Sequence, residues 1–599
     1  MVADKDLQSI QEVRTKVAAA HEAFQQFRGH TQEQVDRIVD QVAAVARANA
    51  ESLAKLAVEE TGYGNVRDKT IKNLLTSDVL HRTIRPMKTV GVIREDRENG
   101  IIEIAEPAGI VAAILPTTNP TSTAFYKILI ALKTKNAIVV SPHPRAVNCT
   151  CEAARLLGEA AEAAGAPKGI VQCLNIATIQ GTNELMKHRR TSLILSTGGP
   201  GIVRAAYSSG KPALGVGPGN VAVLLDDSAD VDEAVGSVID GKSFDYGTVC
   251  SSEQCVVTEE KNRNAVWAAL KKHGAYVCDE NQTTALASLM ITPDFRVNAE
   301  CVGQSPQRIA EMAGFSVGAE IRALVVELKG IGREHPLSAE KLSPVLSVYF
   351  TRDFAEGLKA AAAIVNFGGR GHTCVIYSKN DDRIREFGLA MPAFRILVNT
   401  PSPQGSTGIT TNVQPAMTLG CGAIAGNITG DNVGPMHLIN IKRVAYKVRD
   451  VEAAFTSDEA KSFFAGKPVV SAPTTSTRPT VAAAVDQYLQ RRGVGVPSAS
   501  STPRLTENSG PAAQVVDRFL NGRKTTSPSP QPVTPKANPV SSPPSKPVAS
   551  DVDVVPFVSE DDVRRAKVLQ TKIYINGKTI ITPAARDLDY DGQVMIRTE

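Results

Sequence analysis

Short apolar runs alternate with helical stretches through most of this 599-residue chain, and this alternation constrains the fold more than any other feature. Four apolar runs of strand length come first, at residues 109–115, 137–141, 170–174 and 192–196, with helical patterns such as 122–134 and 151–165 between them. Five more follow at residues 221–225, 252–257, 345–350, 373–377 and 396–398. Because such alternation is typical of parallel sheets with crossover helices, the sequence predicts an α/β fold with two parallel-sheet domains.

The N-terminal part predicts helices followed by a hairpin. Residues 5–85 carry apolar side chains at helical spacing, as in Val35, Ile38, Val39 and Val42. Apolar segments at 90–93 and 101–104 then flank Asn99-Gly100, a dipeptide typical of a tight β-turn. We therefore expect a helical layer and a hairpin spanning 88–106.

The composition changes after about residue 465. Residues 471–478, 493–510 and 525–550 are rich in Pro, Ser and Thr and predict disordered linkers. Between them, 481–492 and 512–523 repeat one motif, in which Val, an aromatic residue and Leu fall on one face of a helix. Short helices of this kind are marginal alone, so we expect them to dock on a partner; chance helical fragments in a disordered tail are the alternative.

The last residues, 554–599, predict a small separate module. A helix is expected to begin after Ser559, where acidic residues suit its N-terminus. Residues 572–575 and 579–581 flank Asn576-Gly577 and predict a second hairpin.

Bulk composition excludes several classes of protein. Lys and Arg total 66 against 62 Asp and Glu, and no polybasic block predicts nucleic-acid binding. No long apolar run predicts a membrane span or a secretion signal, so we expect a cytoplasmic protein. The nine cysteines are scattered without a CxxC pair, which predicts neither a disulfide framework nor a metal site.

Cys250 lies in a segment that favours a reactive thiol. Gly247 and Thr248 precede it, polar residues follow it, and an apolar strand begins only afterwards. A cysteine on a turn at the entrance of a strand is accessible to a substrate, as a nucleophile must be.

Several segments in the same order resemble the aldehyde dehydrogenase superfamily, and within it the CoA-acylating branch. The resemblance covers residues 10–447 and rests on LPTTNPTST (115–123), LKTKNAIVVSPHPRA (132–146), STGGPG (196–201), GVGPGN (215–220), EKLSPVL (340–346), GGRGHT (368–373) and TLGCGAIAGN (418–427), together with the Cys250 segment. It implies an NAD-binding domain with the N-terminal helices at 1–225, a catalytic domain at 226–420 and a return segment at 421–465. Composition and local pattern add linkers at 466–553 and a C-terminal module at 554–599.

The resemblance implies that Cys250 attacks an aldehyde carbon and then carries the acyl group as a thioester. The Cys250 N–H and a side chain of the TTNP segment would stabilise the oxyanion. Asn119 is the expected side chain, although the register is open by one residue toward Thr118, and a turn-forming Asn-Pro is the alternative.

Gly215 decides between water and CoA as the final acceptor. Hydrolytic relatives carry a glutamate base at the aligned position, whereas the loop 214–220 holds no carboxylate. A CoA thiol needs less help than water to attack. The resemblance therefore implies that the acyl group passes to CoA.

The resemblance also assigns cofactor contacts. The nicotinamide cofactor is expected to be NAD; NADP is not excluded, because Arg145 could tolerate a 2′-phosphate. The expected contacts of the cofactor are Thr118, Ser141, Pro142, Thr197, Gly198, Gly199, Gly217, Glu340 and Leu342. Glycine backbone at 197–199 suits a pyrophosphate at a helix N-terminus. His372 would line the CoA or substrate channel; a structural histidine is the alternative.

Taken together, these features predict a reversible, NAD-dependent, CoA-acylating aldehyde dehydrogenase. The tail resembles the encapsulation peptides and short modules of bacterial microcompartment enzymes, which implies a location inside such a compartment, with the tail helices binding shell or cargo proteins. The hairpin resembles an oligomerisation arm, which implies a homodimer or homotetramer. A hydrolytic, CoA-independent dehydrogenase and an inactive assembly protein are the alternatives, and the aldehyde itself is left open.

Overall fold

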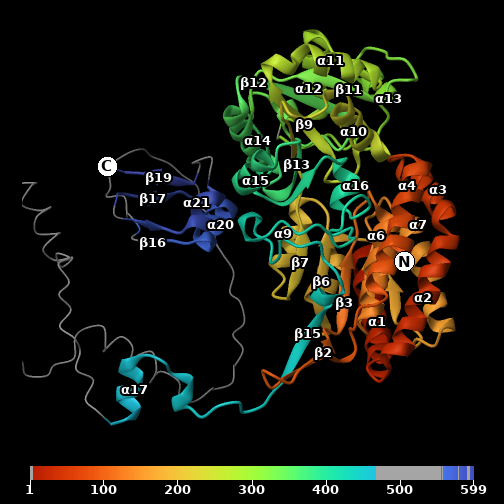
Figure 1. Cartoon of the computed structure of the whole chain (residues 1–599), viewed down its shortest axis with the longest axis vertical. Helices are drawn as coiled ribbons and strands as arrows, with labels where there is room; N and C mark the ends of the chain where they lie inside the picture. Colours follow the sequence, from red (N-terminus) through yellow and green to blue (C-terminus); the bar gives the residue numbers. More distant parts are fainter. Residues whose placement is uncertain are drawn as a thin grey trace, which may run out of the picture. The chain divides into compact units, whose positions relative to one another are not determined.

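The computed structural model describes residues 4–293, 295–466, 555, 557–577, 579–589 and 594–598. The chain forms two compact units, Met1–Val470 and Ser471–Glu599, and each is described by itself (Figure 1). The predicted helices at 481–492 and 512–523, with the linkers around them, lie outside the described residues. Within the described part, no helix is long and apolar enough to cross a membrane.

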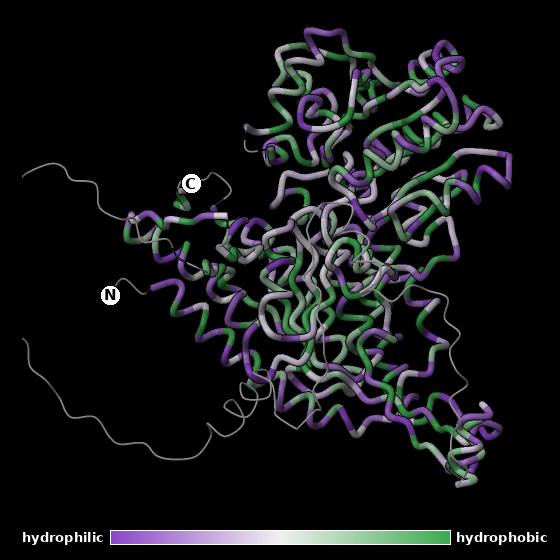
Figure 2. Tube along the Cα trace, turned by 90° about the vertical axis from the view of Figure 1, so that its left-hand side faces the viewer, coloured by the Kyte–Doolittle hydropathy of each residue, from purple (hydrophilic) through white to green (hydrophobic). Residues whose placement is uncertain are grey.

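The N-terminal helical layer is confirmed. Its helices are α1 (Lys5–Phe27), α2 (Gln32–Ala48), α3 (Ala50–Thr61), α4 (Val66–Leu74) and α5 (His81–Ile84), with a π-helical turn at Leu75–Leu80. Thr31 begins α2 with a capping box, because its hydroxyl accepts the Gln34 N–H and the Gln34 side chain accepts the Thr31 N–H. The apolar face predicted for α2 is buried, and in Figure 2 hydrophobic segments gather inside this unit.

A five-stranded parallel sheet, ordered β5-β4-β3-β6-β7, confirms the first predicted strand series. Its strands are β3 (Ile110–Ile114), β4 (Ala137–Ser141), β5 (Val171–Cys173), β6 (Thr191–Thr197) and β7 (Ala213–Val216). The associated helices are α6 (Pro120–Lys133), α7 (Val147–Ala163), α8 (Ile179–Lys187) and α9 (Pro200–Tyr207). The α7 helix begins earlier than predicted because Glu60 of α3 accepts the N–H groups of Asn148 and Cys149, at 2.8 and 2.7 Å.

A seven-stranded parallel sheet, ordered β10-β11-β12-β9-β8-β13-β14, confirms the second series. Its strands are β8 (Val221–Leu225), β9 (Glu253–Glu259), β10 (Ala275–Val277), β11 (Ala323–Glu327), β12 (Val345–Thr351), β13 (Gly371–Tyr377) and β14 (Ala393–Val398). Its helices are α10 (Val231–Ser243), α11 (Arg263–Lys272), α12 (Glu280–Met290), α13 (Pro306–Met312), α14 (Phe354–Gly368), α15 (Asp381–Ala390) and α16 (Ser402–Ser406).

The chain passes from one sheet to the other through the loop 217–220, between β7 and β8. The β8 strand therefore belongs to the seven-stranded sheet. The domain limits at residues 225, 420 and 465 stay a prediction.

The expected hairpin is present and gains a third strand. Strands β1 (Gly91–Asp96) and β2 (Ile101–Pro107) are antiparallel, and β15 (Ile439–Ala445) of the return segment pairs antiparallel with β2 (Figure 1). A short helix, α17 (Asp458–Phe464), follows β15.

The C-terminal module contains β16 (Phe557–Val558), α20 (Glu560–Leu569), β17 (Ile573–Ile575), β18 (Ile580–Ile581), α21 (Pro583–Leu588) and β19 (Met595–Arg597). Ser559 caps α20 in a capping box with Asp562, as the helix start predicted. The second hairpin was wrong. The turn after Asn576 forms, but β17 pairs parallel with β19 and β18 pairs parallel with β16, because the module buries its apolar residues between distant segments.

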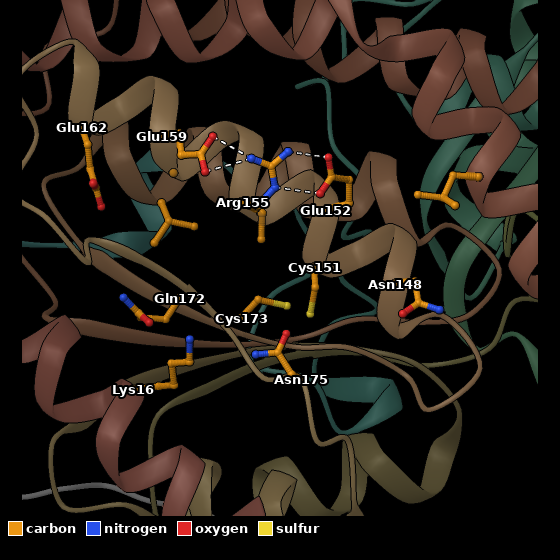
Figure 3. Close-up of a pocket in the computed structure, with 14 residues that line it drawn as sticks. Lys16, Asn148, Cys151, Glu152, Arg155, Glu159, Glu162, Gln172, Cys173 and Asn175 are labelled. Carbon is orange, nitrogen blue, oxygen red and sulfur yellow. Dashed lines mark hydrogen bonds and ion pairs between the residues drawn. The ribbon is translucent and has the colours of Figure 1, made fainter.

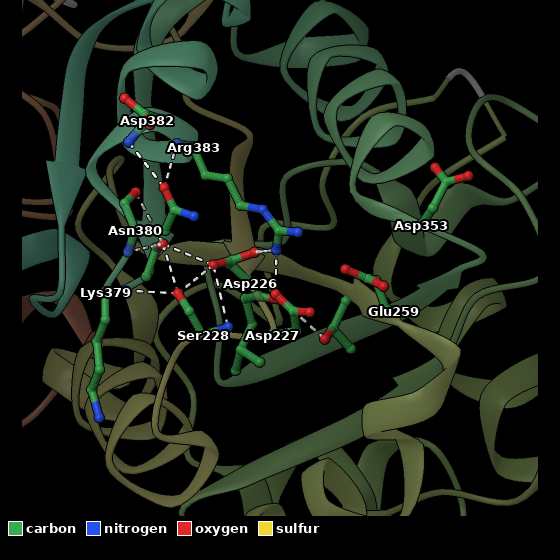
Figure 4. Close-up of polar contacts among 12 residues, drawn as sticks. Asp226, Asp227, Ser228, Glu259, Asp353, Lys379, Asn380, Asp382 and Arg383 are labelled. Atoms are coloured by element: carbon green, nitrogen blue, oxygen red, sulfur yellow. Dashed lines mark hydrogen bonds and ion pairs between the residues drawn. The ribbon is translucent and has the colours of Figure 1, made fainter.

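An ion-pair cluster holds α15 against the carboxyl ends of β8 and β9. Arg383 contacts the carboxylates of both Asp226 and Asp227 (Figure 4). Lys261 pairs with Asp227 at 2.6 Å and with Glu259 at 3.0 Å. The Asp226 side chain is fully buried and also accepts hydroxyl groups of two serines. These cations neutralise a group of close carboxylates.

We predict that Arg383→Met lowers the free energy of unfolding by about 2 kcal/mol. A buried carboxylate without its cation costs several kcal/mol, reduced here because Arg383 is partly exposed and the serine hydroxyls remain. The matched control is Arg385→Met on the same helix, whose exposed pair with Asp382 is worth less than about 0.5 kcal/mol. Denaturant unfolding measures both; equal effects of the two variants would contradict the prediction.

Candidate functional site

Cys250 lies on a turn that ends two residues before β9, as the sequence predicted. The Ser252 N–H donates to the Val249 carbonyl oxygen at 2.8 Å and closes the turn. Just upstream, Asp245 and Tyr246 both have left-handed backbone, with φ of 47° and 51°. Such strain in non-glycine residues persists only where the surrounding structure requires it and is common at functional sites.

Glycines allow other backbone segments to approach Cys250 closely. A Cβ at Gly219 would collide with the Cys250 carbonyl oxygen and would lie 3.3 Å from the His372 ring. A Cβ at Gly369 would collide with the Asn220 N–H, and one at Gly371 with the Cys421 carbonyl. The loop 215–220, the Cys250 turn, the 369–371 segment and Cys421 therefore converge.

His372 contacts the thiol directly. Its Nε2 lies 3.2 Å from the Cys250 Sγ, and its Nδ1 lies 2.9 Å from the Thr373 Oγ1. The residue is fully buried at the start of β13. Burial, aided by the nearby Arg395 cation, holds the pKa of His372 well below its ordinary value, so the imidazole is neutral.

The thiol of Cys250 is protonated in this state. Burial, together with the charges of Glu340 and Cys421, raises its pKa to about 12, although the Arg395 cation opposes this rise. Activation of Cys250 as a nucleophile therefore requires stabilisation of its thiolate.

Glu340 is attached to the same group of segments. Its Oε1 accepts the Gly219 N–H at 3.1 Å. Burial raises the pKa of Glu340 to about 8, although the Gly219 N–H and two buried lysines favour the charged form. A carboxyl group that titrates near neutral pH is suited to exchange protons at a site.

Two side chains that the sequence analysis left out belong to the site. Arg395 of β14 is buried, donates to the carbonyl oxygens of Gly430 and Gly420 at 3.0 and 2.5 Å, and donates to Thr373 Oγ1 at 3.3 Å. Cys421 is buried where its charge would interact with Cys250. An arginine within the apolar strand of β14 was the available signal.

Asn119 contacts a buried network of charged side chains. It begins α6, and its Oδ1 accepts the Lys72 Nζ at 2.5 Å while its Nδ2 donates to Thr118 Oγ1 at 3.0 Å. Lys72 also pairs with Asp245, which lies five residues before Cys250. Burial lowers the pKa of Lys72 to about 8 against the attraction of Asp245.

Gly215 is packed so tightly that a longer side chain has no room. A Cβ there would lie 2.9 Å from both the Tyr207 ring and the Val203 methyl group. The Tyr207 hydroxyl donates to the Gly215 carbonyl at 3.1 Å and accepts its N–H at 3.0 Å. Tyrosine therefore occupies the space that a base at position 215 would need.

The predicted cofactor residues lie on several elements. Thr197, Gly198 and Gly199 link β6 to α9, whose N-terminus has no side-chain cap, and a Cβ at Gly199 would meet nothing within 4 Å. These N–H groups fit a pyrophosphate. The Gly217 N–H faces Cys421, and Leu342 follows Glu340 by two residues with a left-handed φ of 45°.

Ser141 and Pro142, at the end of β4, are not among the segments that converge on Cys250. The Ser141 hydroxyl lies 3.0 Å from that of Thr182 on α8. Directly after them, Pro144 and Arg145 line a cavity of about 410 Å³. This places Arg145 beside open space near the expected ribose position.

A larger cavity, of about 750 Å³, lies elsewhere, against α7 and β5 (Figure 3). Cys151 and Cys173 face each other in it, and Arg155 pairs with Glu152 and Glu159. Its lining includes none of the predicted site residues.

The comparisons with known proteins identify the class. Residues 2–411 match the model of the aldehyde dehydrogenase family. The chain belongs to this family.

Individual relatives show which members of the family this chain is similar to. The bifunctional aldehyde-alcohol dehydrogenase of Escherichia coli K12 is 44% identical over 449 residues, 74% of this chain and 50% of the relative. The chain thus spans about half the length of the first curated relatives that it matches. The crystal structure of an acetylating aldehyde dehydrogenase from Geobacillus thermoglucosidasius is 50% identical, with a TM-score of 0.74 over 75% of this chain and 99% of the other.

Two propionaldehyde dehydrogenase structures are more distant. One comes from the fucose utilisation bacterial microcompartment of Clostridium phytofermentans, with 29% identity and a TM-score of 0.66 over 72% of this chain and 97% of the other. The other, from Rhodopseudomonas palustris, holds bound propionyl-CoA, with 27% identity and a TM-score of 0.66 over 72% of this chain and 94% of the other.

We predict that Lys72→Met lowers kcat for aldehyde oxidation by at least about tenfold with little change in KM. Loss of the ammonium frees the Asn119 side chain, and misplacing one oxyanion donor costs up to about 10²–10³-fold in kcat. The control is Lys55→Met, which removes an exposed lysine paired with Glu51. Steady-state kinetics with circular dichroism as a fold check measure the effect; wild-type kcat in Lys72→Met would contradict it.

Proposed function

We propose that this protein oxidises an aldehyde to an acyl-CoA, reversibly, with Cys250 as the nucleophile. The observation that carries the proposal is the partly buried Cys250, whose Sγ lies 3.2 Å from the His372 Nε2. Membership of the aldehyde dehydrogenase family and the 50% identity to an acetylating aldehyde dehydrogenase support it.

Cys250 performs the covalent steps. Its thiolate sulfur bonds to the aldehyde carbon, and the carbonyl electron pair moves to oxygen, where the Cys250 N–H and the Asn119 side chain stabilise the negative charge. A bound nicotinamide supplies the acceptor for the hydride that leaves this carbon. Re-formation of the carbonyl then leaves an acyl thioester on Cys250.

The thioester passes to CoA rather than to water. Attack by a CoA thiolate forms the new carbon–sulfur bond, and the bond to Cys250 breaks with its electron pair returning to the sulfur. Water would need a general base, and Tyr207 fills the space beside Gly215 where hydrolytic relatives carry one. The propionyl-CoA bound in the R. palustris relative supports the same acceptor.

The residues of this chain fit a nicotinamide cofactor. We assign the uncapped N-terminus of α9, with Thr197, Gly198 and Gly199, to the pyrophosphate. Glu340 is assigned to the nicotinamide ribose, with Thr118, Ser141, Pro142, Gly217 and Leu342 as further contacts. NAD is the proposed form of the cofactor. A structurally similar protein, an engineered glycolyl-CoA reductase, holds bound NADP⁺, so the activity assay also includes NADP.

We predict that the purified protein with an aldehyde and NAD forms NADH only when CoA is present, with acyl-CoA in equal amount. Cys250→Ala is expected to abolish this turnover because no other group takes over the acyl transfer. Cys255→Ala is the matched control, since that thiol is buried inside β9. Absorbance of NADH and chromatography of acyl-CoA measure the products.

NADH formed without CoA would favour the hydrolytic alternative. Absence of NADH with every aldehyde tested would favour an assembly protein without activity. Repeating the assay with NADP decides the cofactor.

We further propose that the protein resides in a bacterial microcompartment. The repeated amphipathic motif at 481–492 and 512–523 suits binding to a groove of a shell or cargo protein. The dehydrogenase of C. phytofermentans, which comes from such a compartment, supports this location. The three-stranded sheet of β1, β2 and β15 is the proposed contact of a homodimer or homotetramer.

We predict that truncation after residue 465 keeps the specific activity but abolishes association with shells. The described residues of the candidate site all precede this point, whereas the segments 481–492 and 512–523, predicted to be helical, follow it. Co-purification with shell proteins measures association, and a truncation after residue 553 is the control that keeps both helices. Unchanged co-purification of the shorter protein would contradict the docking role.

A further inference from the structure

Three hydrogen bonds in series lie behind the Cys250 thiol. Arg395 Nε lies 3.3 Å from Thr373 Oγ1, Thr373 Oγ1 lies 2.9 Å from His372 Nδ1, and His372 Nε2 lies 3.2 Å from Cys250 Sγ. Thr373 and His372 have no exposed surface, and Arg395 is 5% exposed. Because solvent does not reach these groups, each must find its partners within the protein.

Arg395 sets the direction of the first bond. A guanidinium donates hydrogen bonds and accepts none, so Thr373 Oγ1 must accept from the Arg395 Nε. The other contacts of the guanidinium go to the carbonyls of Gly420 and Gly430 and to the Asn432 side-chain oxygen. Within the part of the chain that the structure describes, no carboxylate forms an ion pair with Arg395.

Thr373 then sets the state of the imidazole. Its hydroxyl has one proton to donate, and the His372 Nδ1 is the acceptor that the described structure places within reach of it. A ring nitrogen that accepts a hydrogen bond carries no proton. Since the ring is neutral, its single proton is on Nε2, the nitrogen that faces the Cys250 sulfur.

We infer that Thr373 and Arg395 are positioning residues that fix the proton of His372 on Nε2, so that His372 donates a hydrogen bond to the Cys250 sulfur. The inference rests on the proposed function of Cys250 and assigns His372 the role of a donor instead of a base. When the thiol ionises, the S–H bond breaks, its electron pair stays on sulfur, and the proton passes to water through the exposed part of Cys250.

The donor acts twice in the reaction. It stabilises the thiolate that attacks the aldehyde, and it stabilises the same sulfur when the bond to the acyl carbon breaks during transfer to CoA. Of the other charged groups that face the thiol, the Arg395 cation favours the thiolate, whereas Glu340 and Cys421 oppose it when ionised.

Alkylation by iodoacetamide tests the inference on the full chain. The thiolate fraction of a thiol that ionises far above neutral pH grows tenfold per pH unit, so the alkylation rate should rise by about 100-fold between pH 7 and 9. Thr373→Val removes the hydroxyl, and we expect the Cys250 rate at each pH to fall by about tenfold, as a rise of about one pKa unit requires. Thr373→Ser should restore the rate. Peptide mapping distinguishes alkylation of Cys250 from alkylation of the other eight cysteines.

Thr258→Val is the matched control. Thr258 is a buried threonine of β9 in the same sheet, and its hydroxyl donates to the Leu225 carbonyl at 3.0 Å. Its substitution removes a buried hydroxyl that forms no hydrogen bond to Cys250, His372 or Arg395, so the alkylation rate should not change. A wild-type rate in Thr373→Val, or an equal loss in Thr258→Val, would overturn the positioning role.

Two variants of His372 separate a donor from a base. The amide nitrogen of His372→Gln donates a hydrogen bond but cannot take a proton at these pH values. We expect His372→Gln to keep the alkylation rate within about threefold of the wild type and His372→Ala to lose about tenfold. Equal losses in both variants would indicate a base.

The tautomer is also visible without a variant of the threonine. In protein labelled with ¹⁵N-histidine, two-bond ¹H–¹⁵N correlations show which ring nitrogen is protonated, and the His372→Gln spectrum identifies the signals of His372. A proton on Nε2 is expected, and a proton on Nδ1 would overturn the inference even if Thr373→Val failed to fold. Neither experiment uses aldehyde, nicotinamide or CoA, so its failure is distinct from failure of the proposed reaction.

Discussion

The candidate site depends on a close approach of backbone segments that only glycine permits. Gly219 packs against the Cys250 carbonyl, Gly369 against Asn220 and Gly371 against Cys421. A side chain at any of these positions would separate the segments, and with them the thiol, the imidazole and the Glu340 carboxyl. The same contact joins the two parallel sheets, because the loop 217–220 leads from β7 into β8.

Burial and nearby charges then set the protonation states of the side chains that these segments bring together. Burial favours a protonated thiol, a neutral imidazole and a carboxyl group that titrates near pH 8. Arg395 and Lys72 are buried cations that contact different side chains of the site, Arg395 donating to Thr373 beside the imidazole and Lys72 to Asn119. In the proposed reaction, the negative charge that develops on oxygen and sulfur would be met by preorganised donors, which need no reorganisation when it forms.

Local pattern predicted most elements but not those that depend on distant partners. Most strands of both sheets and the hairpin around Asn99-Gly100 followed from apolar periodicity and turn chemistry. The start of α7 was missed because Glu60 caps it from another helix, and the second hairpin failed because β17 and β18 pair with distant strands. Strands β7, β10 and β11 were also missed.

The sequence by itself determined the α/β class, the turn that carries Cys250 and the missing carboxylate at Gly215, because each depends on residues that are neighbours in the chain. Only the tertiary structure decided that His372, 122 residues away, meets the Cys250 sulfur, that Arg395 lies behind it and that Tyr207 fills the space beside Gly215. Hydrogen-bond direction and the pKa of a buried group depend on partners from several elements, and these come together only on folding.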